Sequence, residues 1–303
     1  MGNRSHYPSF RIFLLCVTLG RCLVSRLPQI ELFRKILDKW MFGVMEYKME
    51  ANLLRYEFPT AEKTRTFLRL SNLFTQLEWL ASQDNYHCHE AALLKYFNIQ
   101  DATQRGDQKN DIIQELERNR IALSAYVGNP DVDQTLLNDT LERITRSVTE
   151  INAIGLRLSH LSSQNEFLRM MNQRSAIPAG FCEFDIPSYH HWLNLPDSIR
   201  KEHLSKWLSP MKAYHRAVAL ILEILRDSVT VRKGLVAKQG TFEIPMQGKV
   251  FPLVQVFVDP SLDFVPKVSA NKYMLSVYFV PSGFNGRVVP SIDVPFELGL
   301  CSI

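Results

Sequence analysis

The sequence predicts an α+β protein with two parts, a helical domain that contains a long antiparallel helical hairpin and an antiparallel β-sheet domain. Between residues 60 and 227, apolar residues recur every three or four positions, the spacing of helices with one buried face. After Arg226 the pattern changes to alternating or continuous apolar runs rich in valine, isoleucine, phenylalanine and tyrosine, which is typical of strands. With 303 residues, 46% of them hydrophobic, the chain is long enough for one or two domains.

Residues 1–48 are predicted to be a leader outside the folded domains. Their apolar run IFLLCVTL (12–19) is too short to span a bilayer, which takes about 20 residues, so no membrane insertion is expected. No small-residue cleavage site follows the run, which disfavours a signal peptide. We favour a start codon placed upstream of the true start, at Met45 or Met49, over a retained or targeting segment.

Charge and cysteine content limit the possible partners and compartment. Residues 1–49 carry eight basic and three acidic residues, whereas residues 50–303 carry 27 basic and 28 acidic ones. The body is therefore nearly neutral, and no nucleic-acid partner is expected. The five cysteines are scattered, form no CxxC motif and favour a reducing, cytoplasmic compartment; they are Cys16, Cys22, Cys88, Cys182 and Cys301.

The first folded elements are predicted to be a strand and a helix. The segment LLRYEF (53–58) has short alternating character and is followed by Pro59, so we expect one strand that joins a sheet formed later in the chain. From Thr60 a helical stripe begins that predicts the first long helix; it consists of Phe67, Leu68, Leu70, Leu73, Phe74, Leu77 and Leu80.

The helical hairpin is predicted between Asp107 and Leu161. Apolar residues recur at intervals of three and four on both sides of the turn GNPDVD (128–133), as in a coiled-coil-like pair. Asn119 is a polar residue within this seam and is a candidate for fixing its register. The two stripes can pack on the domain's own core, which we favour, or form a seam shared between two subunits.

Prolines shape the predictions for the rest of the chain. We expect residues 197–227 to form two helices because Pro210 ends or kinks the helical pattern. Strands are expected in TFEIPM, KVFPLVQVFV and KYMLSVYFV. Pro290 and Pro295 predict that the final segment is an edge strand or two short strands.

Four segments follow from these patterns. The helical domain comprises residues 49–177 and 197–230, with strand 53–58 joining the sheet, and the β-domain comprises residues 231–303. Residues 178–196 form a junction rich in proline and aromatic residues, in which Pro178 and Pro187 exclude regular helix. We expect this junction to lock the helical and β halves together.

Two clusters could carry chemistry. Cys182 with His190 or His191 could form a thiolate–base pair, and a cysteine-dependent hydrolase is therefore the alternative function. Flanking phenylalanines favour the simpler interpretation of Cys182 as a small buried residue. His87, Cys88 and His89 are consecutive, so they point in different directions on a helix and are not expected to share a metal. Phosphate-binding glycine motifs are absent from the sequence, and no cofactor is expected.

Basic residues occur in small sets along the chain: Arg65 and Arg69, Arg105 and Lys109, and Lys267 and Lys272. Most such side chains are solvated and contribute little. If two sets converge in space, they form a shallow basic pocket that suits an acidic or carboxylate-ended peptide.

Several motifs, in order and at compatible spacing, resemble the ZapD family of cell-division proteins from Leu53 to the C-terminus. They are YEFPTAEKTRTFLRL (56–70), QRGD (104–107), YVGNPDVDQ (126–134), RSAIPAGFCEFDIPSYHHWLNLP (174–196) and NKY (271–273). The resemblance implies a non-enzymatic cytoplasmic homodimer at the mid-cell division ring. It also implies binding to the C-terminal tail of FtsZ and crosslinking of FtsZ filaments into bundles.

The resemblance further implies roles for single residues. Arg105 lies at the family's basic helix end and is the first candidate for a contact with the tail. Lys109, Lys272 and Arg65 belong to the small basic sets described above and are the other candidates for partner binding. Arg69 and His190 match positions that are important for the helical core or the dimer.

Three residues depart from the family pattern. Met274 and Tyr278 stand where relatives can carry arginines, and Glu166 replaces a basic residue. These differences predict a weaker or differently built basic pocket.

Overall fold

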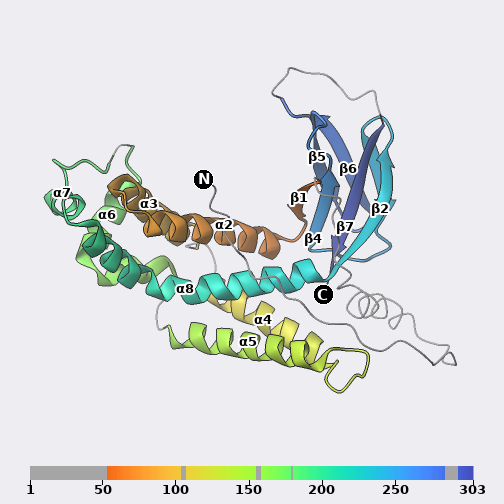
Figure 1. Ribbon diagram of the computed structural model, residues 1–303, viewed down its shortest axis with the longest axis horizontal. Helices are drawn as coiled ribbons and strands as arrows, with labels where there is room; N and C mark the ends of the chain where they lie inside the picture. The colour runs from red at the N-terminus through yellow and green to blue at the C-terminus, as the bar shows by residue number, and fades with distance from the viewer. Residues whose placement is uncertain (1–52, 104–106, 155–157, 179, 284–292, 303) are drawn as a thin grey trace, which may run out of the picture.

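The computed structural model describes residues 53–103, 107–154, 158–178, 180–283 and 293–302, and it confirms the α+β class. The predicted leader and Arg105 lie outside these residues. Figure 1 shows a helical part beside a part made of two sheets. The helices are α2 (Glu62–Ser82), α3 (Tyr86–Ala102), α4 (Gln108–Ser124), α5 (Gln134–Ala153), η1 (Leu158–Gln164), α6 (Glu166–Ser175), α7 (Pro187–Leu193) and α8 (Asp197–Asp227).

The helical part has three layers around α8. Helices α2 and α3 lie on one side of α8, and the hairpin of α4 and α5 lies on the other (Figure 1). The predicted stripe of α2 is buried at Phe67, Leu70, Phe74 and Leu77, which pack in one core with residues of α3 and α8. The prediction that Pro210 divides residues 197–227 is wrong, because α8 is continuous through it. Pro210 removes one backbone hydrogen bond, but packing on both sides holds the helix together.

The predicted hairpin is confirmed. Asp133 caps α5 by accepting hydrogen bonds from the backbone N–H groups of Thr135 (2.9 Å) and Leu136 (3.1 Å). Gly128 has a φ of 79°, which favours glycine at this turn. The hairpin is shorter than predicted, since α5 ends at Ala153 and the chain continues into η1. The seam residues Ile112, Leu116, Ile144 and Ile151 belong to the core of the same chain, as we favoured.

The segment 178–196 differs from its prediction in two ways. Pro187 does not exclude helix but begins α7, because the first helical position needs no backbone N–H and suits the fixed φ of proline. The segment also does not lock the two halves of the molecule together. It joins α6 to α8, and α7 lies at the end of the helical part that is farthest from the sheets (Figure 1).

A buried pair of side chains, Arg200 and His89, holds this far end together. The Nε atom of Arg200 donates to Nδ1 of His89 (3.1 Å), and its Nη1 donates to the carbonyl oxygen of Leu193 (2.7 Å). Nε2 of His89 lies 2.6 Å from the carbonyl oxygen of Gln83, to which it donates when Nδ1 accepts. Arg200 also pairs with Asp197. Burial lowers the pKa of His89, so the neutral ring is the stable form.

The other part consists of two antiparallel sheets with a shared core between them. The four-stranded sheet has the order β1-β4-β7-β2 and the three-stranded sheet has the order β3-β6-β5. The predicted strand 53–58 is confirmed as β1, which pairs with β4. The strands are β1 (Leu54–Pro59), β2 (Val229–Ala237), β3 (Thr241–Pro245), β4 (Leu253–Val258), β5 (Phe264–Ala270), β6 (Met274–Pro281) and β7 (Val294–Cys301).

The prediction for the final segment is wrong for its described part, because β7 is a single strand between β4 and β2. Pro295 pairs with Val236 of β2 at the beginning of β7, whereas the pairing with β4 starts only at Glu297. A proline at this position removes no hydrogen bond from the β4 side, so a central strand tolerates it. Pro290 lies outside the described residues.

An ion pair joins the helices to the four-stranded sheet. Arg226, near the end of α8, donates two hydrogen bonds to Glu57 of β1, at 2.8 and 2.7 Å. Gln255 of β4 donates a third to the same carboxylate (3.1 Å). Burial alone would raise the pKa of Glu57, but the hydrogen bonds and charge of Arg226 outweigh it and hold that pKa below its ordinary value.

Candidate functional site

The outer face of the three-stranded sheet exposes aromatic and basic side chains. Side chains alternate along β6, so Leu275, Val277 and Phe279 are buried against the other sheet while Met274 and Tyr278 point outward. Tyr278 is 38% exposed and Met274 is 36% exposed. Large apolar groups on a solvent-facing sheet are a sign of a binding surface.

Neighbouring strands place other side chains beside Tyr278. It pairs directly with Thr241 of β3 on one side and with Lys267 of β5 on the other. Directly paired residues share one face of a sheet, with Cβ atoms roughly 5 Å apart. One row along, the hydroxyl of Ser276 donates to Glu243 (3.0 Å). A lysine and a tyrosine are therefore adjacent on an open surface.

The turn before β6 extends this surface. The side-chain oxygen of Asn271 accepts hydrogen bonds from the backbone N–H groups of Tyr273 (2.8 Å) and Met274 (2.9 Å), which fixes the turn. The ring of Tyr273 is 69% exposed, and Nζ of Lys272 lies 4.7 Å from its centroid. We call this surface the β6 face; it comprises Thr241, Lys267, Lys272, Tyr273, Met274 and Tyr278.

Of the three described residues that were predicted to bind a partner, Arg65, Lys109 and Lys272, only Lys272 belongs to the β6 face. Arg65 donates to the carbonyl oxygen of Pro59 (3.2 Å) and pairs with Glu62 (3.1 Å) in the first turn of α2. Lys109 donates to the carbonyl oxygen of Ile154 (2.8 Å) and thereby ties the start of α4 to the end of α5. Arg105 is not described, so its role stays a prediction.

The residues predicted for the core or the dimer have different surroundings. Arg69 and His190 are exposed and do not belong to the core of the single chain. His190 Nδ1 lies 2.5 Å from a carboxylate oxygen of Glu183. Asn119 is fully buried, and neither of its amide atoms hydrogen-bonds a residue in the part of the chain that the structure describes. Its role in fixing register and the dimer roles of the others stay predictions.

The alternative catalytic cluster gains no support from the geometry. Cys182 is half-buried in the turn that precedes α7, while His190 and His191 are both exposed. The nitrogen Nδ1 of His190 is occupied by Glu183. Among the described residues, no three histidine, cysteine, aspartate or glutamate side chains are grouped to hold a metal ion.

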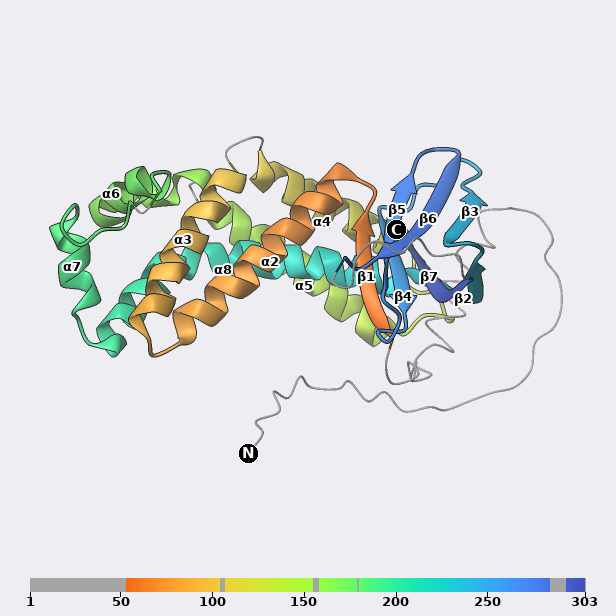
Figure 2. The ribbon, with the colours of Figure 1, turned by 90° about the horizontal axis from the view of Figure 1, so that it is seen from above.

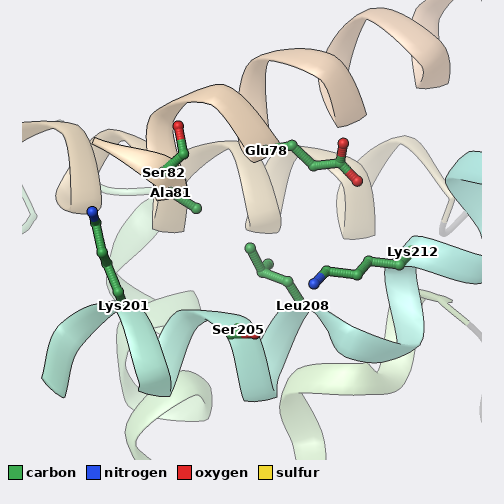
Figure 3. A pocket seen from close by; sticks show the side chains of 7 residues that line it. All are labelled: Glu78, Ala81, Ser82, Lys201, Ser205, Leu208 and Lys212. Atoms are coloured by element: carbon green, nitrogen blue, oxygen red, sulfur yellow. The ribbon is translucent and has the colours of Figure 1, made fainter. Parts of the chain in front are cut away.

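A groove of about 330 Å³ lies between α2 and α8. Figure 3 shows Lys201 and Lys212 of α8 on either side of Leu208, facing the α2 side of the groove with Glu78. Acidic groups already lie near both lysines. Nζ of Lys201 lies 2.5 Å from Asp84. The hydrogen bond from His215, with a contribution from the charge of Lys212, lowers the pKa of Glu78, so this carboxylate is a negative neighbour of Lys212. The groove is therefore a weaker candidate for an anion than the β6 face.

The β6 face contains residues that the sequence patterns did not single out as a site. Tyr273 was identified only as part of the NKY motif, and Met274 and Tyr278 only as departures from the family pattern. The period-2 alternation of KYMLSVYFV was the available signal, since it places Met274 and Tyr278 on the same side of a strand. It could not tell which side faces solvent.

Comparison with known proteins shows the family of the chain. A family model described as ZapD, a cell division protein, matches residues 68–278. The cell division protein ZapD of Cupriavidus necator is 37% identical over 254 residues, which cover 82% of this chain and 100% of the relative. ZapD proteins of Chromobacterium violaceum and Bordetella pertussis are each 37% identical, over 252 and 255 residues, covering 82% and 83% of this chain and 99% of each relative. No helix among the described residues is long and apolar enough to cross a membrane. The chain therefore belongs to the ZapD family of cell division proteins.

Proposed function

We propose that this protein binds the C-terminal tail of FtsZ through the β6 face and, as a homodimer, crosslinks FtsZ filaments at the cytoplasmic division ring. The observation that carries the proposal is the exposed row of Tyr278 and Lys267 beside the turn with Lys272 and Tyr273. Aromatic rings offer large contact areas at small entropic cost, and lysines attract carboxylates.

The sheet also offers backbone groups to a peptide. Strands β3 and β5 are both edge strands of the three-stranded sheet. An extended peptide can add to such an edge through main-chain hydrogen bonds while its side chains contact the exposed face. The tail would then bind mainly through apolar contacts with Tyr278 and Met274, and the lysines would add electrostatic attraction.

Crosslinking follows from geometry and needs no chemical reaction. A dimer carries two β6 faces, so it can hold tails from two neighbouring filaments. Each filament presents many tails. Once one site of the dimer is occupied, the second site meets a high effective concentration of tails, so two weak contacts together give tight binding.

Co-sedimentation with FtsZ polymers tests the proposal. The full chain should pellet with polymers of intact FtsZ and stay in the supernatant with FtsZ that lacks its tail. Arg105→Glu should weaken pelleting if Arg105 contacts the tail. Equal pelleting with tail-deleted FtsZ would contradict tail binding.

A further inference from the structure

The three-stranded sheet has two edge strands, and they differ in what they offer to a peptide. Figure 2 shows β5 and β3 on opposite sides of β6. In an antiparallel ladder, successive residues direct their backbone N–H and C=O groups alternately toward the partner strand and away from it. Every second residue of an edge strand therefore presents both groups to a further strand.

Strand β5 presents two such residues in its second half. The N–H of Asn271 donates to the carbonyl oxygen of Met274 (3.0 Å), so the odd-numbered residues of β5 direct their backbone groups at β6. Val268 and Ala270 direct theirs to the other side. In the part of the chain that the structure describes, β5 pairs with β6 alone. The N–H and C=O groups of both residues are therefore open to an added strand.

Pro266 limits where a strand can add to β5. It occupies the outward position before Val268, so its missing N–H costs the ladder with β6 nothing. A strand that added opposite Pro266 would find no donor there. The donors begin at Val268 and continue at Ala270, directly before the turn that holds Lys272 and Tyr273. The open stretch of the β5 edge thus ends beside the exposed lysine and tyrosine of the β6 face.

Strand β3 offers fewer donors. Its ladder with β6 leaves Thr241, Glu243 and Pro245 in the outward positions. The N–H of Thr241 already donates to the carbonyl oxygen of Lys238 (3.0 Å), and Pro245 has no N–H. Of the outward positions of β3, only Glu243 keeps an N–H for a further strand.

Charge separates the two edges in the same direction. Lys267 of β5 pairs with Tyr278 and is exposed on the outer face of the sheet. On β3 the outer face carries Glu243, which accepts a hydrogen bond from the hydroxyl of Ser276 (3.0 Å). An acidic peptide would run beside a lysine at β5 and beside a carboxylate at β3. Complementary charge favours β5.

We propose that an acidic peptide adds to β5 as a further strand, hydrogen-bonded to the backbone of Val268 and Ala270. The inference rests on the proposed function in that the FtsZ tail is this peptide. Alternate side chains of the added strand then lie on the outer face beside Lys267, and a large one can reach Tyr278 across the lysine's aliphatic stem. Backbone bonds supply affinity, and the alternate side chains supply specificity.

Hydrogen–deuterium exchange followed by NMR tests the edge in the full chain without any substitution. Saturating tail peptide should slow exchange at the N–H groups of Val268 and Ala270 by about tenfold or more, because each becomes a hydrogen-bond donor. Exchange at Glu243 of β3 should not change. Slowing at Glu243 equal to that at Val268 would overturn the choice of β5. Unchanged exchange at all three residues with peptide bound would overturn strand addition.

Tail peptides that each carry one N-methyl group test the same bonds from the peptide side. An added strand directs alternate N–H groups at β5. Methylation should therefore raise the dissociation constant about threefold to tenfold at every second position of the bound segment and leave the positions between unchanged. Losses at consecutive positions, or at none, would contradict an added strand.

Ala270→Pro tests the edge from the protein side, since it removes one outward N–H and no hydrogen bond to β6. It should raise the dissociation constant of the tail peptide about threefold to tenfold. Glu243→Pro is the matched control, because it removes the corresponding N–H of β3 and should not weaken binding. Circular dichroism should show that both variants fold. Equal losses in the two variants, or wild-type affinity of a folded Ala270→Pro protein, would contradict the proposal.

A second peptide separates this inference from the proposed function. The probe is an acidic, strand-forming peptide of alternating valine and glutamate. If this probe slows exchange at Val268 and Ala270 while the FtsZ tail peptide does not bind, the edge stands and the proposed function fails. If the tail peptide binds and Tyr278→Glu abolishes that binding, but exchange at Val268 and Ala270 is unchanged, the proposed function stands and the edge fails.

Discussion

The β6 face and the end of α2 around Trp79 both expose an aromatic side chain, but they differ in charge. The β6 face combines Tyr273 and Tyr278 with Lys267 and Lys272. Trp79 is 60% exposed, and its neighbours include the exposed acidic residues Glu78 and Asp84. Lysines beside an exposed ring attract a carboxylate and acidic residues repel it, so the comparison favours the β6 face as the surface for an acidic peptide.

The largest expected effect comes from placing a carboxylate in the β6 face. Tyr278→Glu should weaken binding of an FtsZ tail peptide by about thirtyfold or more, since it removes a central aromatic contact and sets a negative charge beside Lys267. Fluorescence anisotropy of a labelled peptide measures this. The dimer mass should not change.

Phe184→Ala is the control for Tyr278→Glu, because it removes a more exposed aromatic residue from the segment that precedes α7. Its affinity for the peptide should equal that of the wild type. Equal losses in both variants would mean that the β6 face has no special role.

The next largest effect is expected on stability, from the ion pair between the helical part and the four-stranded sheet. Arg226→Ala removes both hydrogen bonds to the half-buried Glu57 and should lower the free energy of unfolding by about 1–3 kcal/mol. The matched control is Arg143→Ala, which breaks a similar two-bond pair with Glu223 on a more exposed surface. Urea denaturation should show a loss below about 1 kcal/mol for this control; the reverse order would contradict the account.

Salt should have a smaller, severalfold effect on binding at the β6 face. Raising sodium chloride from 50 to 500 mM screens exposed lysines, so tail binding should weaken a few fold. Fluorescence anisotropy of the labelled peptide at both salt concentrations measures this. Binding that is unchanged or tighter at 500 mM would argue against a role for Lys267 and Lys272.

The smallest effect concerns pH and the far end of the helical part. Because burial lowers the pKa of His89 in the folded state, the unfolded chain binds more protons below the ordinary value of 6.5. Stability from this group is complete above pH 6.5 and declines as the pH falls toward the folded pKa. Protonation of His89 also removes the acceptor for the hydrogen bond from Nε of Arg200 and places two positive charges side by side.

His89→Gln tests this pH dependence, since glutamine keeps one donor and one acceptor but does not titrate. Thermal melts between pH 7.5 and 5.5 should show a smaller decline for the variant than for the wild type. Identical declines would assign the pH dependence to other groups.

Local patterns predicted most of the fold. Apolar periodicity predicted the stripe of α2, the hairpin with its turn at Gly128 and strand β1. Each of these features depends on residues that are neighbours in the sequence. The errors came from prolines whose effect depends on long-range partners. Pro210 is overridden by packing around α8, and Pro295 is tolerated because β4 pairs only beyond it.

The candidate surfaces were harder to predict than the fold. Lys272 was identified from the sequence, but Lys109 and Arg65 are engaged by carbonyl groups of their own surroundings, which spacing cannot reveal. Exposure of Trp79 and Tyr278 depends on what covers each helix and strand. A helical wheel gives the sides of α2, and only the assembled layers show which side remains open.

The most direct test of the account compares FtsZ binding with FtsZ bundling for the wild type and for Tyr278→Glu. Centrifugation at high speed pellets all polymers with the protein bound to them, and centrifugation at low speed pellets only bundles. The account predicts that the wild type pellets with polymers at high speed and forms bundles at low speed, whereas Tyr278→Glu stays in the supernatant and forms no bundles. Binding and bundling by Tyr278→Glu at the wild-type level would contradict it.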